Sequence, residues 1–288
     1  MAFESIIENM IERSEHVIPR NEGDYIGEDG LLYCGNCHTR KQTEIEVFGK
    51  KRRPYCLCKC EMQKKEEQEK AEKEAIKQKE FQEQVKKMRS VGFPEGDKMA
   101  NWTFENDDMA NKVLTEAMKN YVANFKEMQE RGKGLLLWGE KGTGKTFAAC
   151  EVANALIDKG YPVLATNFAR LTNTLQGMYE GKQDYIDNLN KFALLVIDDL
   201  GAERKTDFMQ EMVWNIVDSR SRAGLPMIIT TNLTIDEIKN PDGIGCGRIY
   251  DRIIERCHPI NVKGVNRRKK KAGAEYLDMQ KLLGLTDN

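Results

Sequence analysis

Residues 139–146 read Gly-Glu-Lys-Gly-Thr-Gly-Lys-Thr, and the rest of the fold can be worked out from them. They fit the G-x-x-x-x-G-K-[ST] pattern of a phosphate-binding loop. Four apolar residues, 135–138, come before the loop and predict a buried parallel strand. A helical pattern of apolar residues follows from 147 and stops at Gly160. A strand, a glycine-rich turn and a helix in this order predict a nucleotide site at a helix N-terminus, where backbone N–H groups favour phosphate.

Each residue of this loop has an expected role in holding a nucleoside triphosphate. Lys145 is expected to reach the β- and γ-phosphates, and the hydroxyl of Thr146 is the expected ligand of Mg²⁺. The glycines allow the backbone to turn around the phosphates. The predicted ATP-binding residues are Gly139, Glu140, Lys141, Gly142, Thr143, Gly144, Lys145, Thr146 and Phe147.

From about residue 100 onward, apolar runs of strand length alternate with helical patterns. Strands are expected at 134–138, 161–166, 192–197, 226–231 and 259–263. Helices are expected at 107–131, 167–179, 207–222, 234–239 and 247–257. This alternation predicts an α/β fold with a mostly parallel sheet and helices on both faces.

Polar side chains end two of the predicted strands. Asp198 is expected to hold Mg²⁺ together with Thr146, and Asp199 to orient or deprotonate the attacking water. Asn232 follows another strand and is expected to position water near the γ-phosphate. The alternatives are that the two acids cap the next helix and that Asn232 only forms a turn.

Residues 251–256, Asp-Arg-Ile-Ile-Glu-Arg, place Arg252 and Arg256 on one face of a helix. Both can pair with Asp251 or Glu255 within the chain. Alternatively, one of them projects into the ATP site of a neighbouring subunit as an arginine finger. A guanidinium suits that role because it stays charged and binds phosphate in a bidentate manner.

Five of the eight cysteines cluster near the start of the chain, as a C-x₂-C pair and a C-x-C-x-C run. Two such turns fit tetrahedral Zn²⁺, which takes four ligands and would supply folding energy to a short polar segment. The candidates are Cys34, Cys37, Cys56, Cys58 and Cys60. Cys34 and Cys37 form the firm pair. The sequence does not decide which two of the others complete the site, or whether His38 takes part. An iron–sulfur cluster and ordinary reduced thiols are the alternative interpretations. The isolated cysteines are predicted to be small buried residues: Cys150, Cys246 and Cys257.

Composition limits the possible partners and location of the chain. Its 288 residues carry 45 Lys and Arg against 46 Asp and Glu, a net charge of −1, so any surface for nucleic acid must be local. No stretch approaches the ~18–20 apolar residues of a membrane span. The first residues lack the basic region of a secretory signal, so we expect a cytoplasmic location. Cysteines in that compartment favour a metal site over disulfides.

The sequence divides into four predicted segments. They are a zinc-binding domain at 1–60, a charged helical linker at 61–92, an ATPase domain at 93–272 and a tail at 273–288. Residues 1–14 predict an amphipathic helix, which either packs on the zinc module or is offered to a partner protein. The Glu-, Lys- and Gln-rich linker shows no sustained heptad seam, so a solvated helix is expected and not a coiled coil.

Four motifs together resemble those of AAA+ ATPases: 139–146, 194–200, 230–232 and 251–256. Two further stretches resemble sequences of the DnaC/DnaI helicase-loader branch and its relative IstB. They are Asn-Trp-Thr-Phe-Glu-Asn at 101–106 and Leu-Val-Ile-Asp-Asp-Leu-Gly-Ala at 195–202. This resemblance covers about residues 100–268. The cysteine-rich front end followed by a charged linker also resembles loaders of DnaI type, in which an N-terminal zinc-binding domain grips the replicative helicase.

The resemblance implies a role for each motif residue. Lys145 and Thr146 bind phosphate and Mg²⁺, and Asp198 and Asp199 form the Walker B pair. Asn232 corresponds to sensor 1, and Arg256 corresponds to the arginine finger, with Arg252 beside it on the same helix. Arg268 corresponds to sensor 2, with Arg267 as the alternate. Many AAA+ proteins carry Glu at the position of Asp199, so slow hydrolysis and a switch-like use of ATP are expected. About 30 residues follow the finger, too few for a full helical lid.

The function implied is an ATP-dependent loader. It would bind the hexameric DnaB-family helicase through its N-terminal domain, associate with itself into a spiral, and deliver the helicase onto single-stranded DNA. The alternative is an IstB-like ATPase that regulates DNA transposition. The cysteine-rich front end and the long linker favour the loader, and the arginine-bearing helix argues against a small-molecule kinase.

Two features could serve contacts with single-stranded DNA. The basic run 267–271, with Lys263 nearby, either meets nucleic-acid phosphates or forms a solvated tail. Phe168 and Tyr179 either stack on bases or pack within the helical core, and core packing is the favoured interpretation for both.

Overall fold

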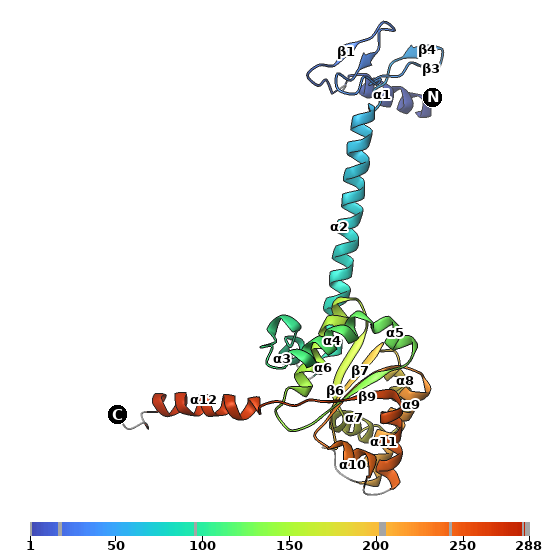
Figure 1. Cartoon of the computed structure of the whole chain (residues 1–288). Coiled ribbons are helices and arrows are strands. Elements are labelled where there is room, and N and C mark those ends of the chain that lie inside the picture. The colour runs from blue at the N-terminus through green and yellow to red at the C-terminus, as the bar shows by residue number, and fades with distance from the viewer. Residues whose placement is uncertain are drawn as a thin grey trace. The chain divides into compact units, whose positions relative to one another are not determined.

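The computed structural model describes residues 2–16, 19–94, 97–201, 206–241, 244–283 and 285. They form two compact units, Met1–Glu80 and Phe81–Asn288. Helix α2 (Lys59–Gly92) starts in the first unit and ends in the second (Figure 1). The other elements of the first unit are α1 (Ala2–His16), β1 (Tyr25–Ile26), β2 (Leu32–Tyr33), β3 (Ile45–Val47) and β4 (Lys50–Arg52).

In the first unit, the strands form two short antiparallel pairs, β1 with β2 and β3 with β4. Helix α1 is joined to the second pair through polar groups, because Arg52 pairs with Glu15 at 3.2 Å and Ser14 accepts a bond from the Tyr55 amide at 3.1 Å. Ile6 and Met10 of the same helix stay exposed. The predicted helix at 1–14 is therefore present, and its polar side contacts the module while these two apolar residues face solvent.

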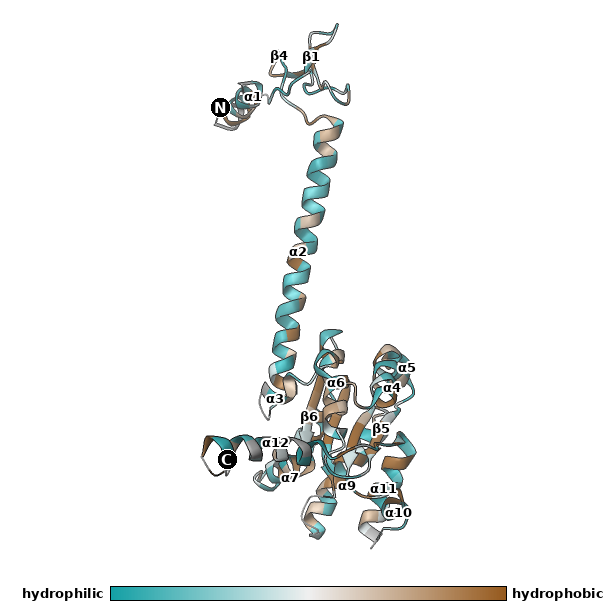
Figure 2. Cartoon of the chain, turned by 60° about the vertical axis from the view of Figure 1, so that its left-hand side comes forward, coloured by the Kyte–Doolittle hydropathy of each residue, from teal (hydrophilic) through white to brown (hydrophobic). Residues whose placement is uncertain are grey.

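Helix α2 extends over 34 residues without an internal proline or glycine before Gly92. Most of its residues are hydrophilic and exposed (Figure 2). Its C-terminal end is not the solvated linker that the sequence predicts, because Val85 and Met88 pack against the core of the second unit. A Cβ placed on Gly92 would lie 2.6 Å from the carbonyl oxygen of Val163, so this end contacts the sheet closely.

The second unit is built on a parallel sheet. Within its described ranges the strand order is β6-β7-β8-β5-β9, and every neighbouring pair is parallel. The strands are β5 (Gly134–Trp138), β6 (Val163–Asn167), β7 (Leu194–Leu200), β8 (Met227–Thr231) and β9 (Cys257–Asn261). Because these strands are parallel, the loop after β5 and the acids at the end of β7 lie at the same edge of the sheet. The end of β8 lies between them.

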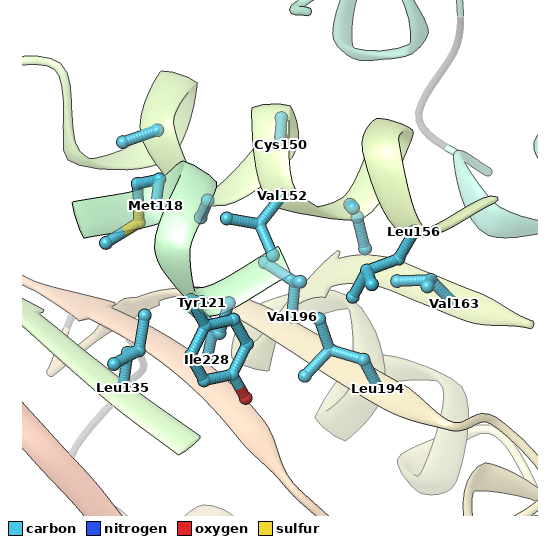
Figure 3. Packing of buried hydrophobic residues seen from close by; sticks show 14 of the residues in the cluster. Met118, Tyr121, Leu135, Cys150, Val152, Leu156, Val163, Leu194, Val196 and Ile228 are labelled. Carbon is cyan, nitrogen blue, oxygen red and sulfur yellow. The ribbon is translucent and has the colours of Figure 1, made fainter. Parts of the chain in front are cut away.

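Helices cover both faces of this sheet, as side-chain alternation along the strands requires. On one face, strand residues such as Leu135, Val196 and Ile228 pack against α4 and α6 (Figure 3). On the other, Leu136 and Ile197 pack against α7, α8, α9 and α11. The helices are α3 (Asp97–Ala100), α4 (Lys112–Ala123), α5 (Phe125–Glu130), α6 (Lys145–Asp158), α7 (Phe168–Gln176), α8 (Lys182–Leu189), α9 (Asp207–Arg222), α10 (Ile235–Lys239), α11 (Ile244–Arg256) and α12 (Arg267–Leu282), with a 3₁₀ turn at Phe104–Asn106.

The predicted α/β fold is confirmed, and α9 and β5 have the predicted bounds. The predicted helix 107–131 is wrong in extent. The side chain of Asn111 accepts a bond from the Leu114 amide and starts α4 there, and a second helix, α5, begins after Asn124. Helix α8 was not predicted, and α12 runs through the expected boundary at 272/273.

Candidate functional site

The phosphate loop connects β5 to the first turn of α6. Gly144 is the N-cap of α6 with φ = 102°, and Gly142 has φ = 82°, both in the left-handed region that glycine adopts at low cost. A Cβ on Gly142 would lie 2.2 Å from the side-chain oxygen of Asn266, so a larger residue would have to displace that side chain. This arrangement presents backbone N–H groups at the positive end of a helix, which is a site for an anion.

The Lys145 ammonium is held inside the loop. It donates to the carbonyl oxygens of Gly139 at 2.8 Å and Glu140 at 2.7 Å, and to the side-chain oxygen of Asn232 at 2.9 Å. Burial lowers the pKa of this lysine, while the charges of Asp198 and Asp199 oppose that shift. Since its present partners are neutral oxygens, a phosphate offers it a stronger, charge-assisted bond.

Asp198 forms the second part of the site. One of its carboxylate oxygens accepts bonds from the hydroxyls of Thr146, at 2.8 Å, and of Thr230. Burial raises the pKa of Asp198, and the two hydroxyls counteract that change. A carboxylate beside a hydroxyl supplies the oxygen ligands that Mg²⁺ prefers, so Thr146 and Asp198 fit a magnesium ion between them.

Asp199 and Asn232 line the same cleft as Lys145. Asp199 has φ = 57°, an uncommon conformation for a non-glycine residue, at an irregularity in the β7–β8 pairing. Its backbone N–H donates to Thr230 at 3.1 Å, and its carboxylate accepts from Asn232 at 3.4 Å. Asn232 therefore contacts both Lys145 and Asp199, which links the phosphate loop to the predicted catalytic acid.

The segment after β9 passes over the loop. The Val262 amide donates to the carbonyl of Trp138, and the Arg267 amide donates to that of Gly142 at 2.9 Å. The Arg267 guanidinium pairs with Asp108 at 3.0 Å, while Arg268 lines the cleft and acts electrostatically on Lys145 and Asp198. Arg267 and Arg268 both line the cleft, and the choice of Arg268 over Arg267 as sensor 2 stays a prediction.

A cleft of ≈ 580 Å³ runs from these groups to an aromatic wall. Trp102 and Phe147 form that wall, with ring centroids 5.7 Å apart, and Lys98 lies beside them. The sequence motif at 101–106 marked this region only as a resemblance, and Trp102 and Lys98 received no predicted role. The residues lining the cleft are Lys98, Trp102, Lys141, Gly142, Gly144, Lys145, Thr146, Phe147, Asp199, Asn232, Arg267 and Arg268.

Arg252 and Arg256 do not line this cleft. Arg252 pairs with Glu255 at 2.9 Å and with Asp218 at 3.5 Å. Arg256 donates to the Ser221 hydroxyl at 3.1 Å and lies 3.9 Å from Glu255. Arg256 is therefore the less firmly paired of the two, and neither can meet the phosphates held by its own chain in this arrangement.

In the first unit, the structure brings four cysteines together. The Sγ atoms of Cys34, Cys37, Cys58 and Cys60 all lie within 4.8 Å of one another. The Thr39 hydroxyl contributes most to lowering the pKa of Cys37, to about 5. The two remaining candidates lie outside the cluster: Cys56 contacts the carbonyl of Arg40, and the His38 ring contacts Tyr25.

A buried ion pair supports the cysteine cluster. The Lys41 side chain is fully buried and lies 2.8 Å from Asp24 and 3.3 Å from Glu61. Glu61 also accepts bonds from the Cys58 amide at 3.1 Å and from the Tyr55 hydroxyl at 2.7 Å. The turn that carries Cys58 is thereby fixed to the rest of the unit.

Several other predicted residues can now be located. Phe168 is fully buried and Tyr179 fully exposed, so the packing interpretation holds for Phe168 and fails for Tyr179. The basic run 267–271 begins α12, and the side chains of 270 and 271 lie outside the described residues. Cys150 and Cys257 are buried as predicted, whereas Cys246 is half-buried. Within the described ranges, no helix combines the length and apolar character needed to cross a membrane.

The parallel sheet, the phosphate loop after β5 and the acids after β7, with β8 between those strands, define a P-loop ATPase of the AAA+ class. The model of the IstB-like ATP binding protein family matches residues 61–274. The chain belongs to this family of ATP-binding proteins.

Named relatives of the chain are similar over part of their length. The replicative helicase loader DnaI of Bacillus subtilis (strain 168) is 31% identical over 183 residues, which is 58% of this chain and 58% of that protein. The replicative helicase loader DnaC of Buchnera aphidicola subsp. Schizaphis graminum (strain Sg) is 30% identical over 53% of this chain and 63% of its own length. A crystal structure of DnaI covers 60% of this chain and 93% of that chain, with 25% identity and a TM-score of 0.49. The chain thus spans about three fifths of the length of the curated relatives it matches.

Proposed function

We propose that this chain is an ATP-dependent loader of a hexameric replicative DNA helicase of the DnaB family. It binds the helicase through the first unit and delivers it onto single-stranded DNA in the cytoplasm. The observation that carries the proposal is the combination of an IstB-like ATP site with a separate four-cysteine unit on one chain. Two relatives that are named replicative helicase loaders support it.

The four clustered cysteines fit a structural zinc site. A tetrahedral Zn²⁺ with Zn–S bonds of about 2.3 Å separates its sulfur ligands by roughly 3.8 Å, which a set of atoms within 4.8 Å can satisfy. Cys34, Cys37, Cys58 and Cys60 would hold the ion, and bound zinc would supply folding energy to the first unit. The helicase would then meet a pre-formed surface.

In the second unit, ATP occupies the cleft with its phosphates on the loop. Lys145 exchanges the loop carbonyls for phosphate oxygens. Thr146 and Asp198 would hold Mg²⁺, and a bound ion would neutralise negative charge on the triphosphate. Asn232 keeps Asp199 oriented toward a water on the far side of the γ-phosphorus. The water oxygen bonds to the γ-phosphorus and gives a proton to Asp199, while the bond from the γ-phosphorus to the bridging oxygen breaks and leaves ADP and phosphate. The short side chain of Asp199 makes this step slow.

Arg256 acts on a second copy of the chain. It does not line the cleft of its own chain, so its guanidinium would reach the phosphates only across an interface between copies. In a spiral of copies around single-stranded DNA, each Arg256 spreads positive charge over the neighbour's γ-phosphate. Hydrolysis then depends on assembly, which suits a loader that releases after the helicase has closed on DNA.

A second candidate function is an IstB-like ATPase that regulates DNA transposition. The name of the matched family favours it. Such a protein would bind double-stranded DNA and a transposase, and it would not need the cysteine unit for a helicase.

The test is size-exclusion chromatography with light scattering, with the DnaB-family helicase of the same host, with and without ATP. Three forms are compared with the intact chain: Cys58→Ser, its matched control Cys56→Ser, and a form lacking residues 1–60. A stable complex with the intact chain and with Cys56→Ser, lost in the other two forms, is expected. No complex under any nucleotide condition would reject the loader and direct the search to double-stranded DNA and a transposase.

A further inference from the structure

We propose that Asn154 is a positioning residue that joins the aromatic wall of the ATP cleft to the C-terminal end of helix α2. This inference rests on the proposed function, since it requires ATP in the cleft with its base at the wall formed by Trp102 and Phe147. It assigns a role to a polar residue in the core of the second unit that phosphate chemistry does not use.

Asn154 lies in α6, the helix that follows the phosphate loop, and is 1% exposed. Its side-chain nitrogen is 3.0 Å from each of three carbonyl oxygens, those of Cys150, Met99 and Trp102. A buried amide costs free energy unless its hydrogen bonds are made. The segment 99–102 therefore has a fixed position on α6, because moving it would leave this amide without two of its acceptors.

That segment forms one side of the nucleotide cleft. Lys98 and Trp102 line the cleft directly, and the Trp102 ring packs at 5.7 Å from the ring of Phe147. Phe147 itself lies in the first turn of α6. The same helix thus presents one aromatic ring itself and holds the other through Asn154, so the separation of the two rings is set by α6.

Arg89 connects this arrangement to α2. Its guanidinium donates to the side-chain oxygen of Asn154 and to the carbonyl of Ala100, at 3.2 Å for the latter, and it pairs with Asp158. Val85 and Met88 of the same helix pack on the core beside it. The last turns of α2, the segment 99–102 and α6 therefore share one hydrogen-bonded junction.

The consequence is a coupling between the base side of the cleft and the end of α2. A ligand that orders the wall stabilises the junction, and a substitution that disrupts the junction should therefore lower the affinity for that ligand. The phosphate loop, residues 139–146, makes none of these bonds. The coupling should therefore affect a ligand with a base and leave a ligand without one unchanged.

The test compares ATP with inorganic tripolyphosphate on the full chain, each measured by competition with a fluorescent ATP analogue. Asn154→Ala should weaken ATP about tenfold, because two buried carbonyls lose their donor, and leave tripolyphosphate unchanged. Asn154→Asp keeps an acceptor for Arg89 and should weaken ATP similarly, which isolates the amide's donated bonds. Asn120→Ala, an exposed asparagine on α4, is the matched control and should change neither ligand.

The junction with α2 is tested with Arg89→Met, which should weaken ATP about threefold and spare tripolyphosphate. Arg131→Met, at a largely exposed arginine, is its control. Arg89 is partly exposed, so this variant decides the question if the Asn154 variants do not fold. Equal weakening of both ligands, or no change in ATP, would overturn the inference. Failure of the unaltered chain to bind ATP would instead overturn the proposed function, and the inference with it.

Discussion

The strands of the first unit are two or three residues long, whereas those of the second are five to seven residues long and carry helices on both faces. Among the described residues, the buried apolar side chains of the first unit are few: Leu31, Leu32, Cys34 and Cys58. The second unit buries two large clusters, one on each face of its sheet. A unit with so small a core needs another source of stability.

The two units also treat buried charge differently. In the first, the buried Lys41 has two acidic partners and a backbone carbonyl, that of Pro19. In the second, Glu151 is 1% exposed and its Oε1 has no hydrogen-bond partner. The first unit therefore depends on polar and thiol contacts. The second holds its buried Arg220 through backbone carbonyls but leaves one acid unpartnered within apolar packing. If this contrast is right, damage to one unit should leave the other intact.

The largest effect is expected from Lys145→Ala. Removal of the ammonium should lower ATP affinity by roughly 100-fold or more, because a charge-assisted bond to phosphate is lost. Titration calorimetry measures the affinity, with Lys119→Ala, a lysine on the surface of α4, as control. The zinc content of the variant should be unchanged, and a loss of zinc would break the comparison between the units.

Next in size is Cys58→Ser against Cys56→Ser. Cys58 is fully buried in the thiol cluster, so its replacement should remove about one zinc per chain and unfold the first unit. Cys56 lies outside the cluster, and its replacement should do neither. Metal analysis and circular dichroism measure both, and ATP affinity should stay constant. Zinc loss from both variants would show that the cluster is not the whole site.

A smaller effect is expected from Arg256→Ala. ATP affinity should be unchanged, while DNA-stimulated hydrolysis falls by roughly 100-fold because the neighbour's phosphates lose a bidentate donor. The rate per chain should also rise with protein concentration only in the unaltered chain. Arg222→Ala, a largely exposed arginine, is the control. Hydrolysis at the unaltered rate at every concentration would reject the finger assignment.

The smallest effect concerns Glu151 and pH. Burial, and then the charge of Asp107, raise the pKa of Glu151 from its ordinary value of 4.5 to about 8. The folded chain therefore holds this proton more tightly than the unfolded chain. Its stabilising contribution is complete below about pH 4.5 and is lost as pH rises through about 8.

Glu151→Gln keeps this side chain neutral at every pH. Its melting temperature, relative to the unaltered chain, should rise by roughly 10 °C between pH 5 and pH 8.5. Glu116→Gln, on the exposed side of α4, is the control and should show a constant difference. A constant difference for Glu151→Gln as well would show that the acid is ionised in the folded chain, and that apolar packing in the second unit does not tolerate it unpartnered.

Local pattern predicted much of the second unit. The phosphate loop, the order of strands and helices and the acids after β7 follow from residues that are neighbours in sequence. The errors lie where a single polar contact or a weak pattern decides. The Asn111 side chain moved the start of α4, and α8 and α12 have too few apolar residues to be recognised by periodicity.

Of the residues that line the site, the sequence predicted those near the phosphate loop and missed Lys98 and Trp102. The loop residues, Asp198, Asp199 and Asn232 do meet at one edge of the sheet, because parallel strands bring their carboxyl ends together. Trp102 and Lys98 come about forty residues before the loop, and no local pattern connects them with it. Their place in the cleft depends on Asn154 and Arg89, whose bonds cross between elements.

The sequence by itself determined that the chain has a nucleotide loop in an α/β fold and a cysteine-rich front end, since short motifs and periodicity encode both. Only the tertiary structure decided which four cysteines converge and that Arg267 and Arg268 both line the cleft, with Arg267 paired to Asp108. The physical reason is that adjacent residues such as these have the same chemistry. What separates them is the direction in which the folded backbone points each side chain.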